Sequence, residues 1–227
     1  MTPNTAIVEI RSAVGGDEAK IWARDLLRMY LKFAASQGWK SSQIADLTLR
    51  IDGTDAFSKL QHESGVHRVQ RIPLTEKRGR IHTSTATIAV LPQVQESEVN
   101  IRPEDLEWQF YRASSQGGQN VQKVSTAVRV IHKPSGIIVT AEKERFQEQN
   151  RRIALDLLRS KLWEKEELKK EQTIAGYRSP IGRGMRSEKI RTYNFPRNQI
   201  KDHRLNKSFH NLDKILDGEL GKIIDLF

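Results

Sequence analysis

A strand pattern, a turn and the start of a helix follow one another in Ile7-Val8-Glu9-Ile10-Arg11-Ser12-Ala13-Val14-Gly15-Gly16-Asp17-Glu18. The first four residues are mostly β-branched, which favours a strand, and the adjacent glycines predict a turn. The two acidic residues complement the positive end of a helix dipole. Apolar residues then recur at intervals of three and four as far as Phe33, and Gly38 marks a helix end. The stretch therefore predicts a strand followed by an amphipathic helix.

Further strand and helix patterns lie on both sides of an acidic, polar linker at 92–105. We predict strands at 48–51, 85–91, 108–111, 127–132 and 137–140, with the last two forming a hairpin. A charged helix is predicted at about 146–172, a Gly-rich basic loop at 177–191, and helical spacing again at 212–227. Residues 64–83 are basic and punctuated by glycine, and we interpret them as an unusually charged connector. We expect Trp22, Trp39 and Trp163 to be core or partly buried packing residues.

The composition points to a polyanionic partner. The chain has 227 residues, 38 Lys and Arg against 28 Asp and Glu, and a formal net charge of +10. Such a balance is typical of nucleic-acid-binding proteins. No apolar run approaches the roughly 20 residues of a membrane span, and no signal-peptide pattern is present, so no membrane partner is expected. The chain has no cysteine, which agrees with a reducing compartment, and we expect a cytoplasmic location.

The loop at 112–123 is the most informative polar segment. It holds adjacent glycines, small hydroxyls and uncharged amides, and it fits neither nucleotide-binding glycine fingerprint. Because it contains no strong base, it favours positioning and electrostatic stabilisation over proton abstraction. On this pattern alone, a surface loop is the simpler interpretation.

Several motifs accompany this loop in a fixed order. They are Gly15-Gly16-Asp17-Glu18, Glu63-Ser64-Gly65-Val66-His67-Arg68-Val69-Gln70-Arg71, Gly79-Arg80-Ile81-His82-Thr83-Ser84, Gly117-Gly118-Gln119 and Arg191-Thr192-Tyr193-Asn194-Phe195-Pro196. The series, which spans about residues 7 to 220, closely resembles the bacterial-type class I peptide chain release factors. Gly-Gly-Gln alone would be a weak signal, whereas the whole ordered series is specific.

The resemblance implies that Gly117, Gly118 and Gln119 enter the ribosomal peptidyl transferase centre. There the backbone N–H of Gln119 would stabilise the developing oxyanion, and its side chain would admit water and exclude larger nucleophiles. The chain would promote hydrolysis of the peptidyl-tRNA ester only on the ribosome, where rRNA supplies much of the site. The family also implies a glutamine methyltransferase that modifies Gln119 at N5.

The resemblance also implies a stop-codon-reading region. Pro73-Leu74-Thr75 matches the Pro-x-Thr tripeptide of the UAA/UAG-reading subtype. His82 matches a residue that stacks between codon bases, and Gln70 and Thr83 match residues that address the third base. Glu18 matches a residue near the first base. Among the basic residues of the family's switch loop, Arg183, Arg186, Lys189 and Arg191 are expected to contact rRNA phosphate.

Three differences separate the chain from the usual family pattern. Full-length members carry a helical domain before the strand at Ile7, and we expect this chain to lack it. The segment between Trp39 and Leu60 is shorter than usual. The residues that flank Gly-Gly-Gln also differ, and Phe146 replaces a usual Ser. These differences leave open a codon-independent ribosome rescue factor. A silent rRNA-binding protein is a third possibility, which the intact Gly-Gly-Gln disfavours.

The resemblance, together with the strand and helix patterns, predicts an α+β fold. Residues 1–107 would form an α/β codon-reading domain, and 108–175 an inserted small α/β domain that carries Gly-Gly-Gln. Residues 176–227 would supply the switch loop and a C-terminal segment that completes the codon-reading domain. Expected partners are the ribosome, with its rRNA, mRNA stop codon and P-site peptidyl-tRNA, and the methyltransferase. We expect a monomer with no cofactor, and no metal, because His62 and His67 lack further ligands at metal spacing.

Overall fold

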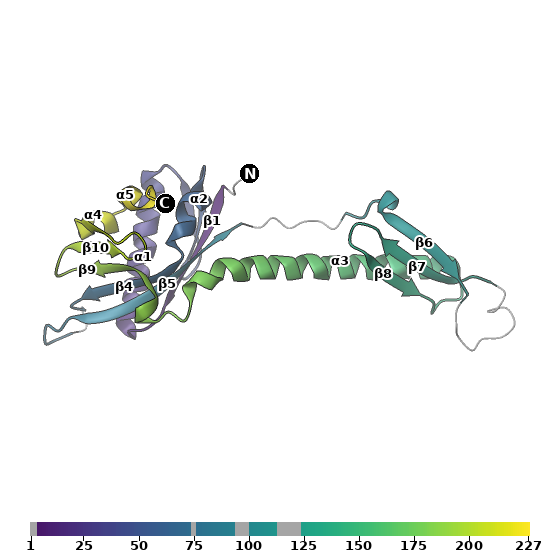
Figure 1. Ribbon diagram of the computed structural model, residues 1–227, viewed down its shortest axis with the longest axis horizontal. Helices are drawn as coiled ribbons and strands as arrows, with labels where there is room; N and C mark the ends of the chain where they lie inside the picture. Colours follow the sequence, from purple (N-terminus) through teal and green to yellow (C-terminus); the bar gives the residue numbers. More distant parts are fainter. Residues whose placement is uncertain (1–3, 74–75, 94–99, 113–123) are drawn as a thin grey trace. The chain divides into compact units, whose positions relative to one another are not determined.

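The computed structural model describes residues 4–73, 76–93, 100–112 and 124–227. The chain forms two compact units, one of Met1–Val94 with Thr173–Phe227 and one of residues 95–172. Each has its own sheet and its own apolar core (Figure 1). The structural division therefore falls after Val94 and Gln172, whereas the sequence patterns had suggested boundaries after 107 and 175.

The first unit is built on an eight-stranded sheet with the order β11-β10-β9-β4-β5-β1-β3-β2. Its strands are β1 (Thr5–Ser12), β2 (Lys40–Ala45), β3 (Thr48–Asp52), β4 (Gly65–Arg71), β5 (His82–Pro92), β9 (Lys189–Asn194), β10 (Gln199–Asp202) and β11 (Lys207–His210). Neighbours are antiparallel except β4 and β9, which are parallel. A parallel pair needs a long crossover, and here the intervening chain includes the whole second unit. The C-terminal segment thus completes the first sheet, and the predicted α+β architecture with an inserted unit is confirmed.

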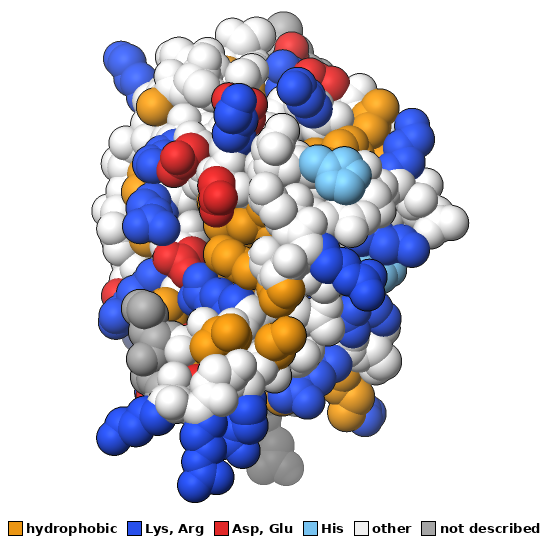
Figure 2. Space-filling view, turned by 90° about the vertical axis from the view of Figure 1, so that its left-hand side faces the viewer, with side chains coloured by type: hydrophobic (Ala, Val, Ile, Leu, Met, Phe, Trp, Pro, Cys, Tyr) orange, Lys and Arg blue, Asp and Glu red, His pale blue; other side chains and the backbone are white. Residues whose placement is uncertain are grey.

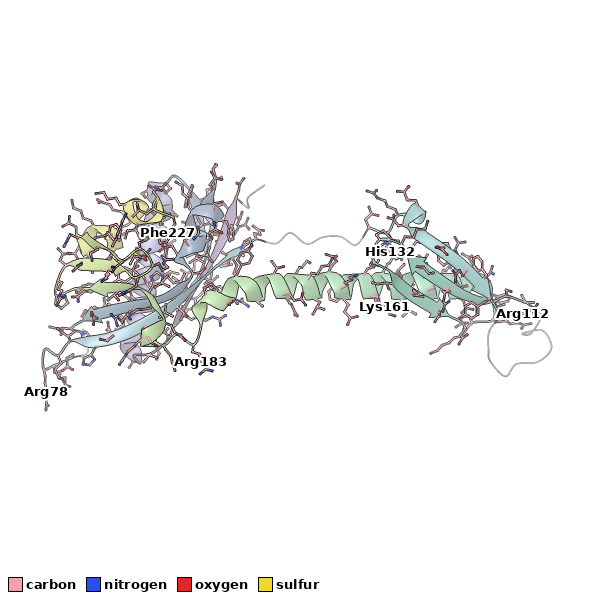
Figure 3. The ribbon with its side chains drawn as sticks, viewed as in Figure 1. Arg78, Arg112, His132, Lys161, Arg183 and Phe227 are labelled. Carbon is pink, nitrogen blue, oxygen red and sulfur yellow. The ribbon has the colours of Figure 1, made fainter. Side chains whose placement is uncertain are left out.

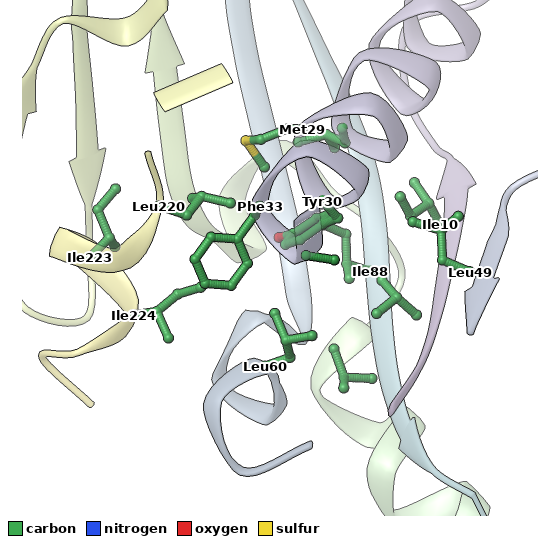
Figure 4. Close-up of a cluster of buried hydrophobic side chains, with 14 of the residues drawn as sticks. Ile10, Met29, Tyr30, Phe33, Leu49, Leu60, Ile88, Leu220, Ile223 and Ile224 are labelled. Atoms are coloured by element: carbon green, nitrogen blue, oxygen red, sulfur yellow. The ribbon is translucent and has the colours of Figure 1, made fainter. Parts of the chain in front are cut away.

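The helix α1 (Asp17–Ser36) covers one face of this sheet. Its apolar stripe, which includes Trp22, Met29, Tyr30 and Phe33, is at most 1% exposed. These side chains belong to one core with sheet residues such as Ile88, and Figure 4 shows Phe33 beside Leu220 and Ile224 of the C-terminal segment. Burial of each such side chain contributes about 1.5–3 kcal/mol, so the helix predicted after the double glycine is a main source of stability.

Short helices complete the first unit. They are α2 (Ala56–Leu60), η1 (Gln61–Glu63), η3 (Ser179–Ile181), η4 (Arg186–Glu188), α4 (Leu212–Leu216) and α5 (Gly221–Ile224). The helical spacing at 212–227 corresponds to α4 and α5, which Gly218 separates. Gly218 has a φ of 106°, and a Cβ there would lie 2.9 Å from the backbone of Lys32 in α1. A glycine is therefore needed for the C-terminal segment to approach α1 this closely.

The second unit is a three-stranded antiparallel sheet packed on the first half of a long helix. Its elements are η2 (Pro103–Asp105), β6 (Leu106–Tyr111), β7 (Ala127–His132), β8 (Ile137–Ala141) and α3 (Gln147–Arg178). The core contains Val128, Val130, Val139 and Leu158. The expected hairpin is β7 and β8, while α3 continues to Arg178. Trp163 on α3 is 60% exposed, so its predicted packing role is wrong.

The predicted charged connector at 64–83 contains a central strand instead. The strand β4 lies between β5 and β9, and Glu63, Ser64 and His67 around its start are buried. Sequence periodicity missed it because hydrogen-bonded polar groups take the inward positions that apolar residues usually fill. Among the described helices, none is long and apolar enough to cross a bilayer.

Candidate nucleic-acid interface

One face of the first sheet carries polar side chains in neighbouring positions. Side chains alternate along each strand, so His67, Val69, Tyr193 and Ile200 turn toward α1 and enter the core. The alternate positions lie on the opposite side of β4, β9, β10 and β11, which we call the outer face. It bears Arg68, Gln70, Thr192, Asn194, Lys201 and His203.

The outer face brings together two of the residues expected to read the codon. Gln70 on β4 is directly opposite Thr83 on β5 and Asn194 on β9. The Asn194 Nδ2 donates to Gln70 Oε1 at 3.1 Å, which orients the Gln70 amide. The result is a row of amide and hydroxyl groups across three strands. Such groups can donate to and accept from the edge of an unpaired RNA base.

His82 precedes Thr83 at the first position of β5, in register with Arg71 on β4. Its side chain is 44% exposed, and Nε2 lies 2.7 Å from Glu76 Oε2. Glu76 also accepts from the backbone N–H of Arg78 and from the Arg80 side chain. The Arg78 N–H, followed by His82 and Arg80, holds the pKa of the Glu76 carboxyl below its ordinary value. The carboxylate thus orients an accessible ring that could stack on a base.

The tripeptide expected to read the codon, Pro73-Leu74-Thr75, is only partly described. Pro73 is buried just after β4, whereas Leu74 and Thr75 lie outside the described residues. Arg78, labelled in Figure 3, marks the same connection between β4 and β5. Because Gln70 and Thr83 are paired across the two strands, this connection begins and ends beside them.

Arg71, the last residue of β4, connects Glu18 at the start of α1 to this end of the sheet. The Arg71 guanidinium donates to Glu18 Oε1 at 2.6 Å and to Asp25 Oδ2 at 2.7 Å, and its strand position is opposite His82. Although burial opposes the charge, these hydrogen bonds raise the pKa of Arg71. Glu18 is only 4% exposed, and its Oε2 is the one buried side-chain oxygen without a partner among the described residues. A hydrogen-bond acceptor therefore remains at the start of α1.

The double-glycine turn holds α1 against β5. Gly15 has a φ of 139°, and a Cβ there would come within 2.3 Å of Ser84 Oγ. The turn is also bonded through its backbone, because Val14 N–H donates to Thr85 Oγ1 at 3.0 Å. Only glycine fits this close approach, so Gly15 sets the position of Glu18 relative to β5.

The basic segment after α3 has a defined conformation. The Glu188 carboxylate accepts from the N–H groups of Arg183 at 2.9 Å and Met185 at 3.0 Å. Arg183 and Arg186 are exposed, and Figure 3 shows Arg183 at the surface of the first unit. Lys189 is partly exposed at the start of β9. These three cations are accessible to a phosphate.

The expected rRNA contact by Arg191 is contradicted by its burial. Its side chain is 0% exposed, and it makes two hydrogen bonds to Glu63, at 2.6 and 2.7 Å. It also donates to Asp202 Oδ2 at 3.2 Å. The guanidinium pairs with these two buried carboxylates, because Arg191 occupies an inward position of β9 while its neighbour Thr192 faces outward. Arg191 is a structural residue of the first core.

In the second unit, the loop that carries Gly117, Gly118 and Gln119 connects β6 to β7, but residues 113–123 lie outside the described residues. Its described ends are paired, since Tyr111 is opposite Ala127. Arg112, at the end of β6, is labelled in Figure 3. The returning end is held by α3, because the buried Asn150 amide donates to the carbonyls of Thr126 and Glu144, both at 2.9 Å.

Sequence patterns alone missed Asn194, Glu76, Arg71 and Asn150. Asn194 lies 124 positions from Gln70, and only the parallel register of β4 and β9 brings them together. Glu76 and Arg71 act by orienting His82 and Glu18, a role that leaves no spacing signal. Asn150 could have been suspected, because an asparagine near the start of a helix often bonds to the preceding backbone.

The charge on the first unit is unevenly distributed. On the face drawn in Figure 2, Asp and Glu side chains lie toward the left and top, interspersed with Lys and Arg, while the lower end and the right-hand side carry Lys and Arg with few acidic side chains. Segregation of this kind favours a polyanion on the basic part of the surface.

Comparison with known proteins identifies related chains. Residues 2–88 match the PCRF domain and residues 95–204 match the RF-1 domain. The chain is 50% identical to peptide chain release factor 1 of Thermotoga maritima, over 96% of this chain and 67% of that protein. It is 49% identical to the Aquifex aeolicus protein of the same name, over 96% and 64%. Among solved structures it resembles RF2 of Thermus thermophilus, with a TM-score of 0.57, 37% identity, and coverage of 98% of this chain and 66% of that one.

These matches cover almost the whole of this chain in two adjacent domains. The chain itself spans about two thirds of the length of the curated relatives. The two domain matches meet between residues 88 and 95, close to the structural division after Val94, while the RF-1 match continues past Gln172 into β9 and β10 of the first unit. The chain belongs to the peptide chain release factor 1 family.

Proposed function

We propose that this chain is a translation termination factor that reads UAA and UAG in the ribosomal A site and promotes hydrolysis of the peptidyl-tRNA ester. The observation that carries the proposal is the register of the first sheet, which lines up Gln70, Thr83 and Asn194 next to His82. Family membership supports the same conclusion. The basic charge of the chain suits a site made largely of RNA.

For codon reading, each group has a chemical task. Thr75, in Pro73-Leu74-Thr75, offers a hydroxyl that can both donate and accept at a base edge. The His82 ring would stack between bases. Gln70 and Thr83 would accept either adenine or guanine at the third position, because the Thr83 hydroxyl can either donate or accept. Glu18 would disfavour the wrong first base by leaving an unmatched carboxylate.

For hydrolysis, the loop at 112–123 would act by stabilising charge. The segment has no strong base, so the proton transfers would rely on rRNA, tRNA and water. The backbone N–H of Gln119 would donate to the developing oxyanion, and the two preceding glycines would allow the backbone to approach the ester. The Gln119 side chain would select water over larger nucleophiles.

The test is release of formyl-methionine from ribosomes programmed with UAA, UAG, UGA, UGG or no A-site codon. We expect release on UAA and UAG only, and weaker release by Thr75→Ala. Gln119→Pro removes the backbone N–H and should lower the rate by about 10²–10³-fold. Gln119→Ala keeps that N–H, so it should lower the rate less and should admit small alcohols as nucleophiles.

Other outcomes would assign the chain differently. Release that ignores both the codon and Thr75→Ala, yet depends on Gln119, would indicate a ribosome rescue factor. Stoichiometric ribosome binding without measurable release would indicate a silent rRNA-binding protein. Equal loss in Gln119→Pro and Gln119→Ala would reject the role of the backbone N–H.

The partners and domain roles belong to the same proposal. Residues 1–107 would read the codon, 108–175 would reach the ester, and 176–227 would provide the switch loop and close the first sheet. Gln119 would be the substrate of a glutamine methyltransferase, and the gain of one methyl group on its peptide in mass spectrometry tests this. The chain would act as a monomer, which light scattering across a range of concentrations would check.

A further inference from the structure

The outer face contains a pocket of about 280 Å³ that lies next to the base-reading row. Its lining side chains are all polar and come from β4, β9, β10 and β11 or from the turns that follow β9 and β10. Gln70 and Asn194 form one side, and Arg68 and His203 belong to the same lining. The pocket is therefore continuous with the residues proposed to meet the codon.

The pocket collects positive charge without a matching carboxylate. Arg68, Arg197 and Lys201 line it together with His203, and none of its lining residues is acidic. Asp202, next along β10, points into the core, where it is 0% exposed and bonded to Arg191. The charges on the outer face are thus left to repel one another in the free protein, a cost that a bound anion would remove.

Arg68 is prepared to bind an anion. Its Nε donates to Thr192 Oγ1 at 3.2 Å, which fixes the guanidinium plane, and among the described residues it makes no ion pair. Within the described part of the chain, its two terminal nitrogens make no hydrogen bond. A fixed guanidinium with two free nitrogens matches two oxygens of a phosphate.

The hydrogen bonds around Arg68 continue to His203. Because Thr192 Oγ1 accepts from Arg68, its hydroxyl proton can point to His203 Nε2, 2.7 Å away. Burial, followed by the positive charges of Lys189, Arg68 and Lys201, lowers the pKa of His203, against the opposing effect of Asp202. The positive charges around the imidazole therefore favour its neutral form.

We propose that this pocket binds a backbone phosphate of RNA, next to the nucleotide whose base meets Gln70 and Thr83. The proposal rests on the proposed codon-reading function and names a further contact for it. Base edges at the row would give specificity, while the pocket would add an affinity that does not depend on the base. The phosphate could belong to the message after the stop codon or to rRNA.

The first test measures release as a function of factor concentration and salt. Lys201→Gln changes an exposed side chain, and Arg68→Gln removes the fixed guanidinium. Each should raise the half-saturating concentration about tenfold at low salt and reduce the salt slope by about one phosphate contact. The release rate at saturation should be unchanged. Lys40→Gln, on the distant edge strand β2, is the matched control and should behave like the unchanged chain.

Two messages separate the sources of the phosphate. One ends at the stop codon and the other continues for several nucleotides. If the two variants raise the half-saturating concentration only on the longer message, the phosphate belongs to mRNA. If they raise it equally on both messages, the phosphate belongs to rRNA. No change for either variant on either message, with folding verified by circular dichroism, would overturn the proposal.

A second measurement tests RNA binding at the pocket independently of peptide release. The ring resonances of His203 are followed by NMR while a single-stranded hexanucleotide RNA is added to the intact chain. We expect the His203 signals to shift in the unchanged chain and in Lys40→Gln, but much less in Arg68→Gln. If codon-dependent release failed but this shift occurred, the pocket would stand and the proposed function would fall. Absence of the shift together with unchanged release in the variants would reject the pocket.

Discussion

At the scale of the residue, Arg191 shows how a basic motif can serve the core. The guanidinium holds two buried carboxylates, Glu63 and Asp202, while Tyr30 donates to Glu63 at 2.7 Å. Burial opposes every charge in this group, and Arg191 nevertheless lowers the pKa of Glu63 and contributes to lowering that of Asp202 to about 2. Removing one partner from such a cluster leaves uncompensated charge in the interior.

We therefore predict that Arg191→Met lowers the free energy of unfolding by about 3–5 kcal/mol. Urea unfolding followed by circular dichroism measures the change. Arg186→Met, in the same basic segment but exposed, should stay within about 0.5 kcal/mol of the unchanged chain. If Arg191→Met kept its stability and lost only ribosome binding, the assignment of Arg191 to the core would be wrong.

His67 adds a pH dependence at the same scale. Its Nε2–H donates to the Glu63 carbonyl at 3.0 Å, so Nδ1 accepts from the Tyr193 hydroxyl at 3.1 Å. Burial, reinforced by Arg191, lowers the pKa of His67 from 6.5 to about 4. Between these values the unfolded chain binds a proton that the folded chain does not, so stability falls as the pH falls.

The predicted loss approaches about 1.4 kcal/mol per pH unit in this window and totals about 3 kcal/mol for His67 once it is complete. Unfolding free energies measured between pH 7 and about pH 5.5 give the slope, above the range in which the buried carboxylates Glu63 and Asp202 contribute. His67→Gln should flatten this slope, and His210→Gln, at an exposed position on β11, should not. An unchanged slope in His67→Gln would show that another group titrates there.

At the scale of the element, α3 controls the returning end of the Gly-Gly-Gln loop. Asn150, near its start, is 0% exposed, donates to two carbonyls and accepts from the Glu144 N–H at 3.0 Å. Three of its four hydrogen-bonding positions are thus used to fix the backbone next to β7. Asn150 is therefore a positioning residue for the loop.

We predict that Asn150→Ala lowers the rate of peptide release at saturation by about tenfold or more, because small misplacement of a reacting group is costly. The half-saturating concentration should change less than about twofold, which a general loss of folding would not produce. Asn150→Asp should be worse than Ala, since a carboxylate would face two carbonyls. Gln149→Ala, at the exposed neighbouring position, should leave the release rate unchanged.

The elements also show what sequence alone could predict. The strand β1, helix α1, the β7–β8 hairpin and α3 follow apolar periodicity, and they were predicted close to their observed bounds. The strands β4, β9, β10 and β11 were missed, because buried ion pairs and a parallel pairing across the inserted unit replace a local pattern. Gln70 and Thr83 were suggested by the resemblance to the release factors, whereas Asn194 and the outer-face pocket required the register.

At the scale of the whole molecule, the two units have separate cores, so each should fold without the other. Tyr193 and Ile200 of the C-terminal segment belong to the core of the first unit, and none of the described residues between 95 and 172 is part of that core. A chain in which a long Gly/Ser linker replaces residues 95–172 should therefore keep β9 beside β4. The linker adds only a slowly growing entropy cost, about 0.6 kcal/mol for each doubling of its length.

This shortened chain lacks Gly117–Gln119 but keeps Gln70, His82 and Thr83. We predict that it folds cooperatively, releases no peptide, and competes with the intact chain on ribosomes that display UAA but not on those that display UGG. Inhibition of formyl-methionine release at increasing concentrations measures the competition. The same shortened chain with Gln70→Ala is the matched control and should compete less well. If the shortened chain folded but competed equally on both codons, stop-codon selectivity would require the second unit, because binding by the first sheet alone would then be independent of the bases.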